Sequence, residues 1–113
     1  MITCKSTHVV YILICPCPLL YVGKTIRALR TRILEHLSAI RRCDATSSVS
    51  QHFQLAKHAI SDLKFLGIER VLPKRRGGDV DNKLLQRESF WIYELNSLFP
   101  KGMNEEINYS CFL

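Results

Sequence analysis

Three stretches of the chain have the apolar and β-branched side chains that are typical of strands. Residues 8–14 (HVVYILI) are apolar after the first position, the pattern of a strand covered on both faces. Residues 19–22 (LLYV) follow a Cys-Pro-Cys-Pro turn closely enough to pair antiparallel with that strand. Residues 64–71 (KFLGIERV) predict a third strand with a bulge at Gly67. Gly23 is expected to free the backbone for the turn into a helix.

Two stretches after the first hairpin predict helices. Residues 26–42 have an apolar residue at every third or fourth position, which predicts one buried stripe. The positions of this stripe are Ile26, Leu29, Ile33, Leu37 and Ile40. Arg32 and His36 stand four residues apart along one edge of the stripe, at the border between core and solvent. Residues 49–59 predict a second, shorter helix.

The last helix, predicted over residues 80–98, has a carboxylate within its apolar face. That face consists of Leu84, Trp91, Leu95 and Leu98. Glu88 lies between Leu84 and Trp91, and an unpaired buried charge is strongly unfavourable. We therefore expect Glu88 to be protonated, paired or bound to a cation. Together the elements predict an α/β fold in which a small three-stranded antiparallel sheet is flanked by helices.

The composition fits a single folded domain over residues 1–113, with 47% hydrophobic and 23% charged residues. The longest apolar run, residues 9–14, is shorter than the roughly 20 residues of a membrane-spanning helix. The first residues do not resemble a secretory signal. We therefore expect an intracellular protein without a membrane partner. Its five cysteines should be reduced, and an odd number cannot all pair in disulfides.

The net charge of +6 favours a polyanionic partner. One group of cations surrounds the start of the first helix, at Lys24, Arg27 and Arg30, and another lies in a glycine-containing loop, at Lys74, Arg75 and Arg76. Both groups are candidate contacts to a DNA backbone, and the second is also a candidate nuclear signal. Solvated basic faces without any ligand explain the same groups equally well.

Two tyrosines of the predicted strands, Tyr11 and Tyr21, join Arg32, His36 and Glu88 as a candidate reaction site. A phenol can take a proton from water, cations can neutralise phosphate, and a carboxylate can bind a metal ion. These are the parts required for metal-assisted phosphodiester hydrolysis. Taken singly, each residue also fits a structural role, as a core aromatic, a surface cation or a salt-bridged carboxylate.

The order of these motifs resembles the GIY-YIG nuclease family, most closely the endonuclease domain of Penelope-like retroelements. Residues 9–11 (VVY) and 21–23 (YVG) match its two tyrosine motifs, and an Arg-x-x-x-His helix follows them. The resemblance extends to Glu88 in a later helix and to Asn104 after it, so that it covers about residues 8–107. It implies a DNA endonuclease that depends on a divalent metal and hydrolyses phosphodiester bonds by nicking or cleavage.

The resemblance also implies a role for each site residue. Tyr11 would be the general base or would position the attacking water, and Tyr21 would support the same site. Arg32 would bind the scissile phosphate, while His36 would orient water or phosphate beside it. Glu88 would bind one Mg²⁺ or Mn²⁺. Asn104 would support the site or contact DNA.

Cys15, Cys17, His52 and His58 form a candidate set of metal ligands. Two thiolates and two imidazoles suit tetrahedral zinc, and four ligands match a closed structural site. Histidines six residues apart do not share a helical face, so a helix must end or distort between them. Spacing alone leaves plain burial of these side chains as an alternative. The resemblance to Penelope-like endonucleases, which carry such a set, implies a structural Zn²⁺.

The first motif has Val9 where the family has glycine. We expect this difference to affect shape rather than chemistry, because the tyrosine is present. It nevertheless leaves two other hypotheses. The chain could be a catalytically inactive, zinc-stabilised module that binds nucleic acid, or a zinc-stabilised domain that binds other proteins.

Overall fold

The computed structural model describes residues 2–17, 19–72, 80–98 and 101–104. The strands are β1 (Val9–Ile14), β2 (Leu20–Thr25) and β3 (Lys64–Arg70), which form one antiparallel sheet in the order β2-β1-β3. The helices are α1 (Leu29–Arg41), α2 (Ser48–Leu55) and α3 (Val80–Glu94), with a short 3-10 helix at Ile60–Asp62. The predicted α/β fold is confirmed. None of the described helices is long and apolar enough to span a membrane.

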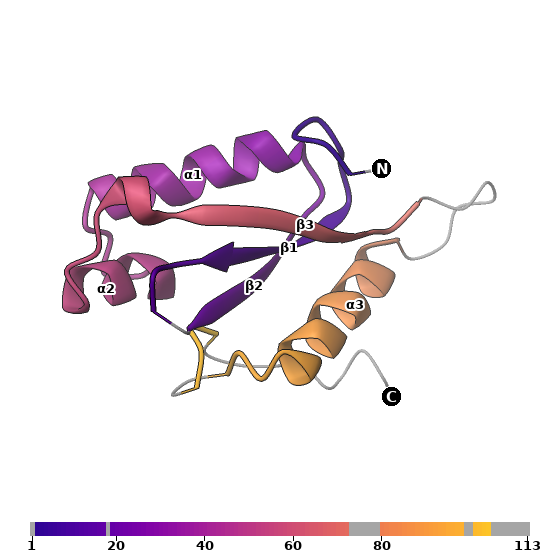
Figure 1. Ribbon diagram of the computed structural model, residues 1–113. Coiled ribbons are helices and arrows are strands. Elements are labelled where there is room, and N and C mark those ends of the chain that lie inside the picture. Colours follow the sequence, from indigo (N-terminus) through magenta and orange to yellow (C-terminus); the bar gives the residue numbers. More distant parts are fainter. Residues whose placement is uncertain (1, 18, 73–79, 99–100, 105–113) are drawn as a thin grey trace.

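β1 is the middle strand, and its successive side chains enter two separate cores. Val9, Tyr11 and Leu13 pack with side chains of α1 and α2, whereas Val10 packs with side chains of α3. All four are fully buried. The helices therefore cover opposite faces of the sheet (Figure 1). This arrangement explains why β1 is apolar along its whole length.

Gly23 lies within β2, directly opposite Tyr11, and not in the predicted turn. A Cβ atom at this position would collide with the ring of Tyr11. Glycine is therefore needed because the ring lies across the neighbouring strand. β2 continues to Thr25, whose hydroxyl accepts the N–H of Arg27 at 3.1 Å where the chain turns.

The bulge predicted near Gly67 is present in the pairing of β1 with β3. Val10 pairs with Glu69 but Tyr11 pairs with Gly67, so one residue of β3 is left over. Val9 is fully buried and pairs with Thr25. Its side chain therefore fills the core beside Tyr11.

Each of the three helices is followed by a residue in the left-handed conformation that is not glycine. These residues are Cys43, Lys57 and Asn96, with φ values of 55°, 57° and 53°. The next N–H in each case donates to the carbonyl five residues earlier, from Asp44 to Ala39, from His58 to Phe53 and from Ser97 to Ile92. This is the Schellman pattern that ends helices. It explains why α2 and α3 stop four residues before their predicted ends at 59 and 98.

α1 begins at Leu29 and not at the predicted residue 26. Ile26 is 53% exposed, so it does not belong to the buried stripe. The first N–H groups of α1 donate to the N-terminal segment, from Leu29 to the carbonyl of Ser6 at 2.9 Å and from Arg30 to that of Cys4 at 2.8 Å. These long-range bonds fix where the helix starts.

Asn104 covers part of the open edge of β2. Its Oδ1 accepts the N–H of Val22 at 2.8 Å, and its Nδ2 donates to the carbonyl of Val22 at 2.8 Å. The hydroxyl of Ser97 donates to the same Oδ1 at 2.7 Å. The buried amide thus takes the place of a neighbouring strand over one residue.

Asn104→Ala should lower the free energy of unfolding by about 2–4 kcal/mol, because it leaves both backbone groups of Val22 and the hydroxyl of Ser97 without these partners. Urea denaturation followed by circular dichroism measures this loss. Ser97→Ala keeps both bonds to Val22 and should lower it by no more than about 1 kcal/mol. Equal losses in the two variants would contradict this role of the amide.

Candidate functional site

A groove of about 690 Å³ lies where α1, α3 and the open edge of β2 meet; we call it the edge groove. α1 contributes Arg32 and His36, β2 contributes Tyr21, and α3 contributes Glu88. Asn104 also lines it, beside the strand edge that it covers. Since α1 and α3 cover opposite faces of the sheet, their side chains meet beyond its edge. Five of the six predicted catalytic residues therefore line one groove.

Tyr11, the sixth, is fully buried behind His36. Its Oη lies 2.7 Å from Nε2 of His36, and the two rings meet edge to face. Tyr21 packs against the same imidazole, with ring centroids 5.5 Å apart. Burial raises the pKa of Tyr11, as does Tyr21 to a smaller extent, and the charge of Arg32 only partly offsets them. Tyr11 is therefore a neutral phenol at neutral pH.

His36 is a neutral imidazole at the wall of the edge groove. It is only 5% exposed. Burial, together with the charge of Arg32, lowers the pKa of His36 to about 4. A neutral imidazole has one donor and one acceptor nitrogen, so His36 can bond Tyr11 on one side and a second polar group on the other.

Arg32 is oriented by Glu35, which the sequence analysis did not single out. Nη1 of Arg32 lies 3.1 Å from Oε1 of Glu35, and Nη2 of Arg27 lies 2.6 Å from the same oxygen. The charges and hydrogen bonds of Arg27 and Arg32 lower the pKa of Glu35. The spacing of three residues between Arg32 and Glu35 was the signal in the sequence.

Glu88 is a partly buried carboxylate that lines the edge groove. Burial raises the pKa of Glu88, while the charges of Lys24 and Arg32 act in the opposite direction. Within the described part of the chain, no ion pair involves Glu88. A hard cation in the groove would compensate the burial of this charge, and carboxylate oxygen is a ligand that Mg²⁺ accepts.

The predicted DNA-contacting cations do not all lie in one place. Lys24 and Arg27 line a second hollow of about 410 Å³, the basic hollow, which also includes Arg32. Arg30 is exposed and lines neither the basic hollow nor the edge groove. Lys74, Arg75 and Arg76 lie outside the described residues.

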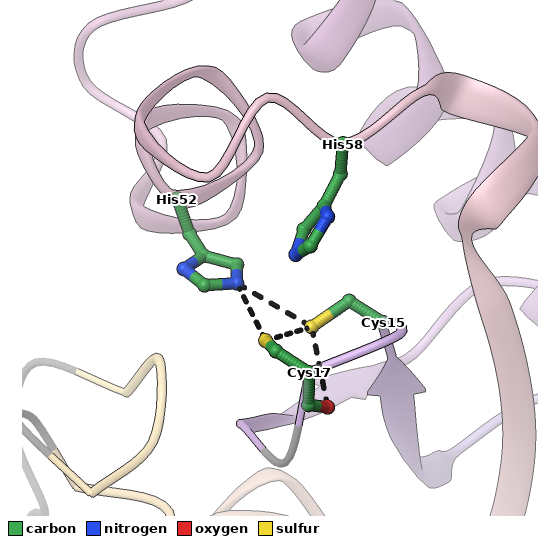
Figure 2. Close-up of side chains that lie close together, drawn as sticks. All are labelled: Cys15, Cys17, His52 and His58. Atoms are coloured by element: carbon green, nitrogen blue, oxygen red, sulfur yellow. Dashed lines mark hydrogen bonds between the residues drawn. The ribbon is translucent and has the colours of Figure 1, made fainter.

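The four predicted metal ligands, Cys15, Cys17, His52 and His58, come together as a Cys/His cluster (Figure 2). Their ligand atoms all lie within 4.8 Å of one another. The two cysteines follow β1, His52 lies on α2, and His58 follows the end of that helix. The left-handed turn at Lys57 brings the second imidazole back toward the first, so that their ring centroids are 5.2 Å apart. Of the two possibilities, that the helix ends or distorts between the histidines, the structure shows that it ends there.

The geometry of the Cys/His cluster suits a four-coordinate ion. Nε2 of His52 lies 3.4 Å from Sγ of Cys15 and 3.1 Å from Sγ of Cys17. Tetrahedral zinc, with bonds of about 2.1 Å to nitrogen and 2.3 Å to sulfur, places such atoms about 3.5 Å apart. The Nε2 atom of His58 is buried and makes no hydrogen bond with any described residue. A bound metal ion would give this nitrogen a partner. The cluster could therefore hold a metal ion.

Both cysteines are free thiols, and their sulfur atoms lie 2.8 Å apart. Burial and the hydrogen bond to Cys17 raise the pKa of Cys15 to about 11. Burial acts in the same direction on Cys17, but its hydrogen bond with Cys15, the backbone of Leu19 and the nearby His58 together outweigh burial and lower the pKa of Cys17. A bound ion must displace the thiol protons and separate the sulfurs to about 3.8 Å.

Comparison of the chain with protein-family models, curated proteins and solved structures finds no match. The edge groove and the Cys/His cluster are the two places where the structure brings predicted site residues together. They lie on different parts of the sheet, because one is built on the edge of β2 and the other on the turn that follows β1.

The folded protein should lose stability as the pH falls from about 6.5 to about 4. His36 stays neutral in the fold down to a pKa of about 4, but it gains a proton near pH 6.5 in the unfolded chain. The unfolded state thus binds more protons in this range, so acid favours unfolding, by about 3 kcal/mol in total.

Urea denaturation across this pH range, with a chelator present, measures the effect. The free energy of unfolding of His36→Asn should fall less steeply than that of the wild type, because the variant lacks the titrating imidazole. Parallel curves for the two proteins would contradict the assignment.

The Cys/His cluster should bind one Co²⁺ per chain, with the visible absorption and sulfur charge-transfer bands of a tetrahedral thiolate site. His58→Ala should weaken binding by at least about tenfold, because a ligand is lost. His8→Asn is the control: His8 lies outside the cluster, and asparagine tolerates its positive φ of 56°. A wild-type chain that binds no Co²⁺ would disprove the site.

Proposed function

We propose that the chain is a DNA endonuclease of the GIY-YIG type, related to those of Penelope-like retroelements, that depends on a divalent metal. The observation that carries the proposal is the meeting of Arg32, His36 and Glu88 in the edge groove. A permanent cation, a neutral imidazole and a partly buried carboxylate are parts that phosphodiester hydrolysis needs. Action on chromosomal DNA would place the protein in the nucleus.

In this proposal, Arg32 binds the oxygens of the scissile phosphate through its planar guanidinium group. It stabilises the negative charge that grows there during attack by water. The ion pair with Glu35 does not prevent this. The side chains of Arg32 and Glu35 are 34% and 40% exposed, and ion pairs that are open to solvent are weak. Glu88 would hold one Mg²⁺ or Mn²⁺, which supplies further charge neutralisation and lowers the pKa of a bound water.

His36 orients the attacking water or a phosphate oxygen through the ring nitrogen that does not face Tyr11. Because Tyr11 is fully buried against His36 and burial raises its pKa, we assign it neither of its two predicted roles, as general base or in positioning water, but the positioning of His36. It would fix the tautomer and the orientation of the imidazole. Asn104 acts as a support, since both ends of its amide are bonded to Val22.

The second part of the proposal is a structural Zn²⁺ in the Cys/His cluster. Two thiolates and two imidazoles fill all four positions of a tetrahedral ion and leave none open for a substrate. The ligands join the turn after β1 to α2 and its end. A bound zinc ion would therefore stabilise the fold and take no part in the reaction.

A catalytically inactive, zinc-stabilised module that binds nucleic acid is the second candidate. The complete burial of Tyr11 favours it, because a buried phenol with a raised pKa is a poor general base. The cations of the basic hollow, Lys24, Arg27 and Arg32, would then bind phosphate without cleavage.

Purified, zinc-loaded protein should nick supercoiled plasmid DNA when Mg²⁺ or Mn²⁺ is added. Glu88→Gln should lower the rate at least about 100-fold, because the charge that would bind the cation is lost. Tyr11→Phe should lower it about 10- to 100-fold, because His36 loses its buried partner.

Glu94→Gln is the matched control, since Glu94 ends the same helix but is exposed and lies outside the edge groove. It should nick at the wild-type rate. Salt-dependent DNA binding by the wild type without nicking would select the second candidate. Neither binding nor nicking would reject both.

A further inference from the structure

The edge groove and the basic hollow share Arg32. From this residue the edge groove follows α1 toward its C-terminal end, past Ser38 and Ala39 to Arg42. The basic hollow lies toward the start of α1, at Thr25 and Arg27. The hollows therefore extend from Arg32 in opposite directions along the helix.

We infer that the nucleic-acid backbone runs along α1, with Arg27 and Arg42 binding phosphates on opposite sides of the one held at Arg32. This inference rests on the proposed function, since Arg32 must bind phosphate. Arg42 follows Arg32 by ten residues. At 1.5 Å per helical residue the two are separated by about 15 Å along the axis, which equals the rise of about four base pairs.

The far end of the edge groove offers donors that suit phosphate oxygens. Arg42 has a side chain that is 61% exposed, and Ser47 and Ser48 also line this end of the groove. The N terminus of α2 opens at the same place, where its first N–H groups have no partner within the helix. This end is therefore a polar continuation of the path from Arg32.

Asp44 is the carboxylate at this end of the groove. Its Oδ1 accepts the N–H and the hydroxyl of Thr46, at 2.9 and 2.7 Å. Its Oδ2 lies 3.4 Å from Nη2 of Arg42, a long and exposed ion pair. A phosphate can replace this partner of Arg42 at little cost, because such surface pairs contribute little. Asp44 itself stays bonded to Thr46.

The part of the path in the basic hollow also has an exposed arginine that is paired with a carboxylate. Arg27 is 53% exposed and contacts Glu35, the carboxylate that also contacts Arg32. Lys24 is a third cation of the basic hollow, beside Arg27 and Arg32, and Asp81 contributes a carboxylate. Phosphates bound at Arg32 and Arg27 would add negative charge beside the two guanidinium groups that contact Glu35.

Two neighbouring arginines provide matched controls for the edge groove and for the basic hollow. Arg30 and Arg41 are exposed, as Arg27 and Arg42 are, but they line neither the edge groove nor the basic hollow. A general attraction between a basic protein and DNA would depend on all four charges alike. A backbone that follows α1 through the two hollows would depend on Arg27 and Arg42 alone.

The experiment measures binding of a fluorescein-labelled DNA duplex of about 20 base pairs by anisotropy at several salt concentrations, without added Mg²⁺. Zinc-loaded wild type is compared with Arg27→Gln, Arg30→Gln, Arg41→Gln and Arg42→Gln. Arg27→Gln and Arg42→Gln should each weaken binding about 5- to 10-fold and reduce the slope of log affinity against log salt by about 0.9. Arg30→Gln and Arg41→Gln should change the affinity less than about twofold.

Equal losses in all four variants would overturn the path along α1, as would larger losses in Arg30→Gln and Arg41→Gln. Circular dichroism of each variant separates these outcomes from misfolding, and plasmid nicking by the wild type separates them from failure of the proposed function. If the wild type nicks DNA but the four variants bind alike, the path alone is wrong. If the wild type neither binds nor nicks DNA, both proposals are wrong.

Discussion

The buried hydrogen bond between Tyr11 and His36 joins the centre of the sheet to α1, and the edge groove depends on it. Gly23 lets the tyrosine ring lie across β2, and α1 places the imidazole against its hydroxyl. Because both groups are shielded from solvent, water does not compete for this bond and the ring orientation is fixed. Arg32, one helical turn earlier, lines the same groove as this fixed imidazole.

The elements and the site residues that depend on local pattern were predictable from the sequence. The apolar run of β1, the stripe of α1 and the apolar face around Glu88 all follow from periodicity. The ends of the helices were not predictable, because Cys43, Lys57 and Asn96 occupy the left-handed positions where glycine is the usual signal. The start of α1 depends on carbonyl groups of the N-terminal segment, which periodicity does not report.

The roles of Gly23 and Asn104 were hidden because their partners are distant along the chain. A glycine at position 23 is typical of a turn. It is needed instead because the ring of Tyr11, on the neighbouring strand, leaves no room for a Cβ atom. Asn104 is separated from Val22 by 82 positions, and a single sequence gives no information on such a pairing. The candidate site therefore consists of predictable chemistry held in place by contacts that become visible only in three dimensions.

The left-handed turn at Lys57 places the end of α2 between two candidate metal ligands. His52 lies in the helix, and the N–H of His58 donates the bond to the carbonyl of Phe53 that closes its end. Helix termini normally fray first when a protein opens locally. An ion held by both histidines would prevent such fraying, so release of the ion and melting of this terminus would become a single cooperative event. The least stable point of an ordinary helix would then be the anchor that ties α2 to the sheet.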